Sequence, residues 1–82
     1  MSKRIGTVSI IISDRVNQSS EVNRILSKHA EIIIGRMGLP YFPKEISIIC
    51  LIVNGSNDQL GSLTGQLGSI KGVQVKSVMV KA

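Results

Sequence analysis

Few residues in this chain of 82 are of the types that perform catalysis or bind a metal ion. His29 and Cys50 are its single His and single Cys, whereas a structural metal site normally needs three or four such ligands at constrained spacing. No serine lies in a nucleophile elbow, and the carboxylates are separated along the chain with no obvious partner base. These carboxylates belong to Asp14, Glu21, Glu31, Glu45 and Asp58. We therefore expect no enzyme activity, no cofactor and no metal site.

Alternatives stay open for His29 and Cys50. His29 follows Val22, Ile25 and Leu26 at the spacing of a helical stripe, which is typical of a packed or rim histidine. As a metal ligand it would have to share a site between protomers. Cys50 lies within an apolar run, where a thiol behaves as a small hydrophobic side chain. An enzyme subunit with chemistry at Cys50 ranks third among the functional hypotheses.

The segment 14–17 is the best candidate for contact with a small molecule. It follows a predicted strand and precedes a predicted helix, and it carries Asp14, Arg15 and Asn17. A charge pair, an amide side chain and a helix N-terminus are thereby brought together, and an anionic group is favoured at such a place. The alternative is a solvated loop whose polar side chains only cap the helix.

Three glycines recur at helical spacing further along the chain, at Gly61, Gly65 and Gly68. Each costs roughly 0.8–1.0 kcal/mol relative to Ala in a helix interior, so some compensation is expected. Close approach of this helix face to a partner backbone or a ligand is the functional interpretation. The alternative is a short helix fitted tightly against its own neighbour. A phosphate-binding loop is excluded, because the glycines lack the Lys-Ser/Thr ending and do not follow a strand.

Apolar periodicity predicts the elements that position these residues. A polar connector over 14–20 precedes an amphipathic helix over 22–29. A second helix begins at a capping box formed by Ser56 and Gln59, and Gly72 is expected to stop it. The predicted strands are, in chain order, residues 4–13, 31–36 and 45–54, and a last strand that begins at Val73 and carries Lys76 and Lys81.

The element order β-α-β-β-α-β predicts an α+β fold, the ferredoxin-like sandwich, in which a four-stranded antiparallel sheet carries both helices on one face. We expect a single domain over residues 1–82. The first and third strands are the richest in apolar residues and should be central. The second should be a short edge strand, because Gly38, Pro40 and Pro43 mark a turn after Arg36.

The third strand is apolar on both faces, whereas in this fold the helices cover only one face of the sheet. One of its two apolar sets should therefore stay uncovered. The two sets are Ile46, Ile48, Cys50 and Ile52 against Ile49, Leu51 and Val53. Contiguous exposed apolar patches of several hundred Å² usually mark an interface. We therefore expect a homodimer or homotetramer that buries sheet faces or aligns sheet edges. The alternative is a half-buried face on a monomer.

The formal net charge of +5 suggests nucleic acid as a partner. The basic residues are dispersed, however, and single-strand binders interleave them with aromatic side chains that are scarce here. A transcriptional regulator that contacts nucleic acid through its basic surface is therefore the runner-up. The longest apolar run, 46–53, is far shorter than the ~20 residues of a membrane helix. With a single Cys and no secretion signal, a cytoplasmic protein without a membrane partner is expected.

Three stretches resemble the family of iron-only hydrogenase system regulators, and the similarity runs nearly end to end. They are IIIGRMGLPY over 32–41, ISIICLIVNG over 46–55, and LTGQLG over 63–68 followed by GVQVKS over 72–77. The Gly-Arg-Met-Gly-Leu-Pro-Tyr stretch is the most specific of them. That family is similar to the ACT domain and to the C-terminal ligand-sensing domain of nickel-responsive repressors.

The resemblance implies a non-enzymatic regulatory module, ACT-like in fold, that assembles through its sheet. It implies a ligand-binding zone at Asp14, Arg15 and Asn17, facing Arg36 of the second strand across a protomer interface. The implied effector is a small molecule such as an amino acid, and the implied readout is a partner protein in the hydrogenase system.

Overall fold

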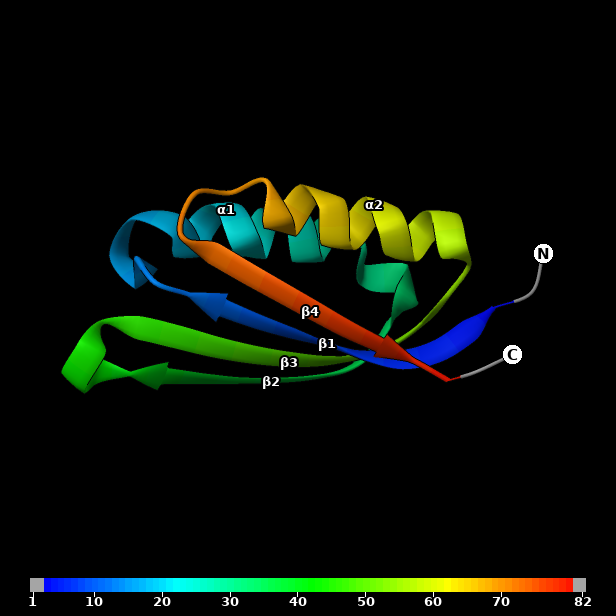
Figure 1. Ribbon diagram of the computed structural model, residues 1–82, viewed down its shortest axis with the longest axis horizontal. Helices are drawn as coiled ribbons and strands as arrows, with labels where there is room; N and C mark the ends of the chain where they lie inside the picture. Colours follow the sequence, from blue (N-terminus) through cyan, green and yellow to red (C-terminus); the bar gives the residue numbers. More distant parts are fainter. Residues whose placement is uncertain (1–2, 81–82) are drawn as a thin grey trace.

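The computed structural model describes residues 3–80. Two helices lie side by side on one face of a four-stranded sheet (Figure 1), as predicted for the ferredoxin-like α+β fold. The strands are β1 (Arg4–Ile12), β2 (Ile33–Tyr41), β3 (Ile46–Gly55) and β4 (Val73–Met79). The helices are α1 (Arg15–Lys28) and α2 (Asn57–Gly68), and short 3₁₀ turns occupy Ala30–Ile32 and Phe42–Lys44. Neither helix is long and apolar enough to cross a membrane.

The sheet has the strand order β2-β3-β1-β4, with all neighbours antiparallel. The predicted placement of the first and third strands at the centre is confirmed. Lys81, which was predicted to belong to the last strand, lies outside the described residues.

The core lies between the sheet and the helices. Val8, Ile10 and Ile12 of β1 face it. Val8 pairs with Leu51 and Ile10 with Ile49, so the Ile49, Leu51 and Val53 set of β3 faces the core as well. The other β3 set therefore lies on the face without helices. The helices contribute their apolar stripes, which consist of Val22, Ile25 and Leu26 from α1 and Leu60, Leu63 and Leu67 from α2.

Several element boundaries differ from the prediction, and two of the differences are large. Helix α1 begins at Arg15, so most of the expected connector over 14–20 is helical. Apart from the exposed Val16, the side chains of its first two turns are polar, so they show no apolar periodicity. Strand β2 does not end before Gly38 but continues through Pro40 to Tyr41. Proline is tolerated there because β2 is an edge strand, where the missing N–H need not break a ladder bond.

The capping box of α2 is confirmed. The Gln59 amide donates to Ser56 Oγ at 3.2 Å, and the Ser56 amide donates to Gln59 Oε1 at 2.9 Å. The helix ends at Gly68 with Ser69 as its cap, so Gly72 does not stop it directly. Gly72 instead takes a φ of 81° in the turn that follows, a conformation that favours glycine.

Candidate functional site

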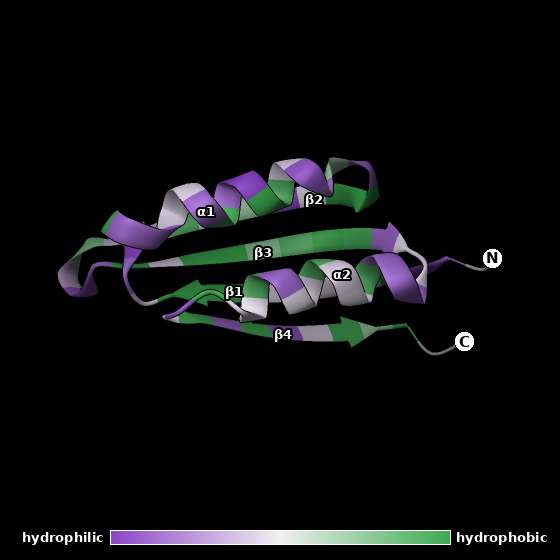
Figure 2. Cartoon of the chain, turned by 90° about the horizontal axis from the view of Figure 1, so that it is seen from above, coloured by the Kyte–Doolittle hydropathy of each residue, from purple (hydrophilic) through white to green (hydrophobic). Residues whose placement is uncertain are grey.

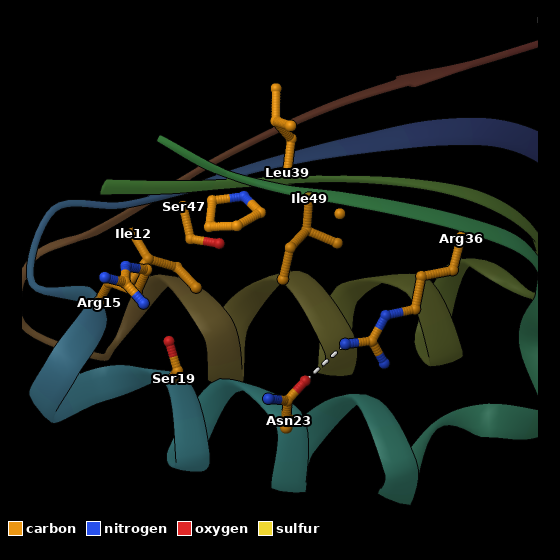
Figure 3. A pocket seen from close by; sticks show the side chains of 10 residues that line it. Ile12, Arg15, Ser19, Asn23, Arg36, Leu39, Ser47 and Ile49 are labelled. Atoms are coloured by element: carbon orange, nitrogen blue, oxygen red, sulfur yellow. Dashed lines mark hydrogen bonds between the residues drawn. The ribbon is translucent and has the colours of Figure 1, made fainter. Parts of the chain in front are cut away.

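A groove of about 290 Å³ lies between α1 and the β2–β3 edge of the sheet (Figure 3). Its walls carry Ile12, Ile49 and Pro40 as apolar groups and Ser19, Asn23 and Ser47 as polar groups. Arg15 and Arg36, two of the residues predicted to bind a ligand, line the same groove. It therefore combines an apolar body with two guanidinium groups.

The groove exists because α1 stands away from β2. Strand β2 turns Arg36, Gly38 and Pro40 toward the helix layer, since they pair with β3 residues on that face of the sheet. Gly38 has no side chain to fill the space, and a Cβ built on it would touch only Ile49 Cγ1, at 3.8 Å. None of these three offers a branched aliphatic side chain such as Val, Leu or Ile, against which the helix could pack closely.

Arg15 is held in place at the start of α1. Its backbone N–H donates to the Glu45 carbonyl at 3.2 Å, and its guanidinium carbon lies 4.9 Å from the centroid of the Phe42 ring, a cation–π contact. The Nε atom is buried and has no hydrogen-bond partner among the described residues. A buried donor without an acceptor is costly, and the described residues leave this one unsatisfied.

Arg36 reaches from β2 across to α1, where its Nη2 donates to Asn23 Oδ1 (Figure 3). Neither this arginine nor Arg15 has a carboxylate within ion-pair distance; within residues 3–80 the recorded ion pair joins Arg24 and Glu21, at 2.7 Å. That exposed pair lowers the pKa of Glu21, chiefly through the hydrogen bond from Arg24, and raises the pKa of Arg24. The groove thus holds two positive charges that the described chain does not neutralise.

Asp14 and Asn17 do not line the groove. The Asp14 carboxylate accepts hydrogen bonds from the Asn17 backbone N–H, at 3.4 Å, and from Asn17 Nδ2, at 2.9 Å. Asp14 is therefore the N-cap of α1, as the capping interpretation of this segment has it. The pair fixes the first turn of the helix and thereby the position of Arg15. The structure brings Arg15 and Arg36 together in one groove of one chain. Asp14 and Asn17 lie outside the groove and hold the helix turn that carries Arg15.

Three polar residues of the groove were not predicted as site residues. Ser19 and Asn23 follow Arg15 at i+4 and i+8, so they form one polar stripe along α1. That spacing was visible in the sequence and would have indicated the site had the helix start been placed at Arg15. Ser47 comes from β3, far along the chain, and only the fold brings it here.

His29 caps the C-terminus of α1 and links it to α2. Its Nδ1 lies 2.8 Å from the Ile25 carbonyl, and its Nε2 lies 3.3 Å from Ser62 Oγ. Because a carbonyl only accepts, Nδ1 carries the proton, and in the neutral ring Nε2 accepts from the Ser62 hydroxyl. No group of three or more His, Cys, Asp or Glu side chains suited to a metal ion occurs in residues 3–80.

The sheet face without helices is apolar, as expected from the third strand. Ile52 is 50% exposed, Met37 74% and Val78 72%, and the strand register places all three on this face. Cys50 is exposed at its centre, paired with Ser9 on one side and Met37 on the other. A hollow of about 480 Å³ opens beside Gly35, where no side chain covers Ile52. We refer to this surface as the open face.

The glycines of α2 lie on its exposed side. A Cβ built on Gly61, Gly65 or Gly68 would meet nothing within 4 Å. The interpretation that they fit the helix against its own neighbour is therefore wrong. Approach by a partner or a ligand stays a prediction.

Comparison with known proteins gives a family and a fold. The family model described as "TM1266-like: Iron-only hydrogenase system regulator, putative" matches residues 4–77. The chain is similar to the uncharacterized protein TM1266 from Thermotoga maritima, with 38% identity, a TM-score of 0.93, and coverage of 98% of this chain and 100% of that one. None of the curated proteins matches.

More distant solved structures share the fold. The ACT domain of GTP pyrophosphokinase from Chlorobium tepidum is 19% identical with a TM-score of 0.78, covering 94% of this chain and 100% of that one. CPII, a nitrogen regulatory PII-like protein from Thiomonas intermedia K12, is 14% identical with a TM-score of 0.52, covering 96% and 92%. The chain is therefore ACT-like in fold.

Proposed function

The chain belongs to the TM1266-like family of iron-only hydrogenase system regulators, and from this membership we propose that it is a non-enzymatic module that senses a small molecule at a site within each protomer, next to the strand that borders the protomer interface. The sensing site is the groove between α1 and β2. Arg15 and Arg36 contact the effector, while Asp14 and Asn17 hold the helix turn that carries Arg15.

The observation that carries this proposal is the Nε atom of the half-buried Arg15. Its Nε is buried without an acceptor among the described residues, and a second arginine shares its groove. Structural arginines are normally paired when buried, because an unmet donor costs about 1–3 kcal/mol. A bound acceptor group removes that cost, so that ligand binding stabilises this end of α1.

Assembly completes the proposal. The open face exposes Ile5, Met37, Ile52 and Val78, and contiguous apolar surface of this kind usually marks an interface. A second copy of the chain covers it in a homodimer or homotetramer. Strand β2 belongs to both surfaces, since Arg36 turns toward the groove and Met37 toward the open face. An effector that holds Arg36 is thereby coupled to the interface and to a partner protein that reads it.

The test is a thermal-shift screen of amino acids, organic acids, nucleotides and divalent metals on the purified protein, because a ligand that binds the folded state raises its melting temperature by mass action. We expect at least one class to raise it in the wild type and in Arg24→Gln, a charge-matched change on the same helix outside the groove. Arg15→Gln abolishes that shift. Light scattering reports the oligomer. A monomer at micromolar concentration, or no shift with any class, contradicts the proposal.

A further inference from the structure

The two arginines of the groove occupy opposite ends of it. Figure 3 shows the Arg15 guanidinium beside Ile12 and Ser47, and the Arg36 guanidinium at the far side beside Asn23, with the Ile49 side chain between them. Positive groups thus flank an apolar centre. A ligand that satisfies both ends must carry an acceptor at each end and a carbon chain in the middle.

The acceptors at both ends are best supplied as carboxylates. Arginine presents a planar fork of donors that matches a carboxylate bidentately. Arg15 has a buried, unpaired Nε, and Arg36 uses one nitrogen on Asn23 and keeps other donors free. No acidic side chain is among the groove residues, so an anion meets no like charge there.

An ammonium group has no place in the same groove. A free amino acid would bring its positive charge between two guanidinium groups, which repel it. The polar neighbours are the hydroxyls of Ser19 and Ser47 and the amide of Asn23, whose Oδ1 already accepts from Arg36. Among the described residues that line the groove, no carboxylate is present to pair with the ammonium.

We propose that the effector is a short aliphatic dicarboxylate without an amino group, with one carboxylate at Arg15 and the other at Arg36. This inference rests on the proposed function, because it names the ligand class of the same groove. The volume of about 290 Å³ agrees with a short chain, since pockets for drug-sized ligands span roughly 300–1,000 Å³. It differs from the amino acid that the family resemblance implies.

Calorimetric titration of the 82-residue protein tests the inference. The probes are malonate, succinate, glutarate and adipate, with butyrate as a monocarboxylate and L-aspartate and L-glutamate as amino analogues of the middle two. We expect one dicarboxylate to bind best, and to bind roughly tenfold or more tightly than its amino analogue and than butyrate. Arg15→Gln and Arg36→Gln each remove that advantage over butyrate, whereas Arg24→Gln keeps it.

The outcomes separate this inference from the proposed function. If L-glutamate or L-aspartate binds as tightly as its dicarboxylate and Arg15→Gln abolishes binding, the dicarboxylate class is wrong while the sensing function stands. If no dicarboxylate binds but another class shifts the melting temperature, the inference is again wrong. If no compound of any class binds, both fail. Arg36 lies on the exposed edge strand, so Arg36→Gln still tests the site should Arg15→Gln not fold.

Discussion

The two halves of the molecule, β1–α1–β2 and β3–α2–β4, follow the same order but are built differently at their edges. Helix α2 packs directly against β4, whereas α1 has no comparable packing against β2 in the described structure. Seen from above, α1 lies on the β2–β3 side and α2 on the β1–β4 side (Figure 2). In the first half a groove separates the helix from the edge strand, and we call it the open half. In the second half the helix packs against the edge strand, and we call it the closed half.

The difference arises from what each edge strand turns toward its helix. Strand β4 offers Val73, Val75 and Met79, which lie in or against the core, while β2 offers Arg36, Gly38 and Pro40. An edge strand that supplies aliphatic side chains adds to the core, and one that supplies an arginine and a glycine leaves room for a ligand. The repeated fold is thus divided into a half whose edge strand adds to the core and a half that carries the groove in which we propose the ligand to bind.

Truncating the core of the closed half should have the largest effect on stability. Leu63 of α2 is fully buried, so Leu63→Ala is expected to lower the free energy of unfolding by roughly 2–5 kcal/mol. Ser19→Ala, which changes only the groove of the open half, should stay within about 0.5 kcal/mol. Urea denaturation at one fixed protomer concentration measures both. If both variants lose the same free energy of unfolding, the closed half does not contribute more to stability than the groove of the open half.

Gly6 of β1 tests how closely β4, the edge strand of the closed half, packs against its neighbouring strand. A Cβ at this position would lie 2.5 Å from both the Val78 carbonyl oxygen and Met79 Sδ. Gly6→Ala should therefore cost about 1–3 kcal/mol through overpacking. Gly35→Ala in β2 is the control, because its Cβ would lie at an ordinary 3.6 Å from Ile52 Cδ1. A Gly6→Ala variant as stable as Gly35→Ala would show that β4 yields easily.

The exposed side of α2 separates stability from assembly within the closed half. Gly61 and Gly65 face open space, so Ala at each should stabilise the protein by roughly 0.5–1 kcal/mol through helix propensity. Thermal melts of the single and double variants measure the gain. If the variants instead lose stability or change oligomeric state in light scattering, a partner approaches this face closely, which is the surviving interpretation of the glycines.

Strand periodicity was enough to predict most of the fold. Alternation in β1 and the two-sided apolar run of β3 fixed the central pair and implied the open face, because burial on both sides leaves a continuous apolar signal. The start of α1 was missed because Ser19 and Asn23 face the groove, where polar residues erase the amphipathic pattern. The end of β2 was missed because Pro40 reads as a turn unless the strand is known to be an edge.

The site was only partly visible in the sequence. Arg15 followed from its place between a strand and a helix, and Arg36 was named through the family resemblance. That the two share one groove depends on the distance between α1 and β2, which is a tertiary property set by Gly38. No local sequence pattern predicts the distance between α1 and β2.

A side chain at Gly38 should fill the groove and make the open half resemble the closed half. Of the changes considered, we expect this one to alter the free energy of unfolding least. Gly38 has no positive φ and faces α1 across the groove, and a Cβ there would make only an ordinary contact with Ile49. Gly38→Val should therefore fold with a change within about 0.5 kcal/mol, aided by the β propensity of valine. It should also occupy space that the ligand needs, so that the best dicarboxylate binds much more weakly by calorimetry. Gly38→Ala should give an intermediate loss. Unchanged binding in Gly38→Val would place the effector elsewhere and leave the gap between α1 and β2 without a function.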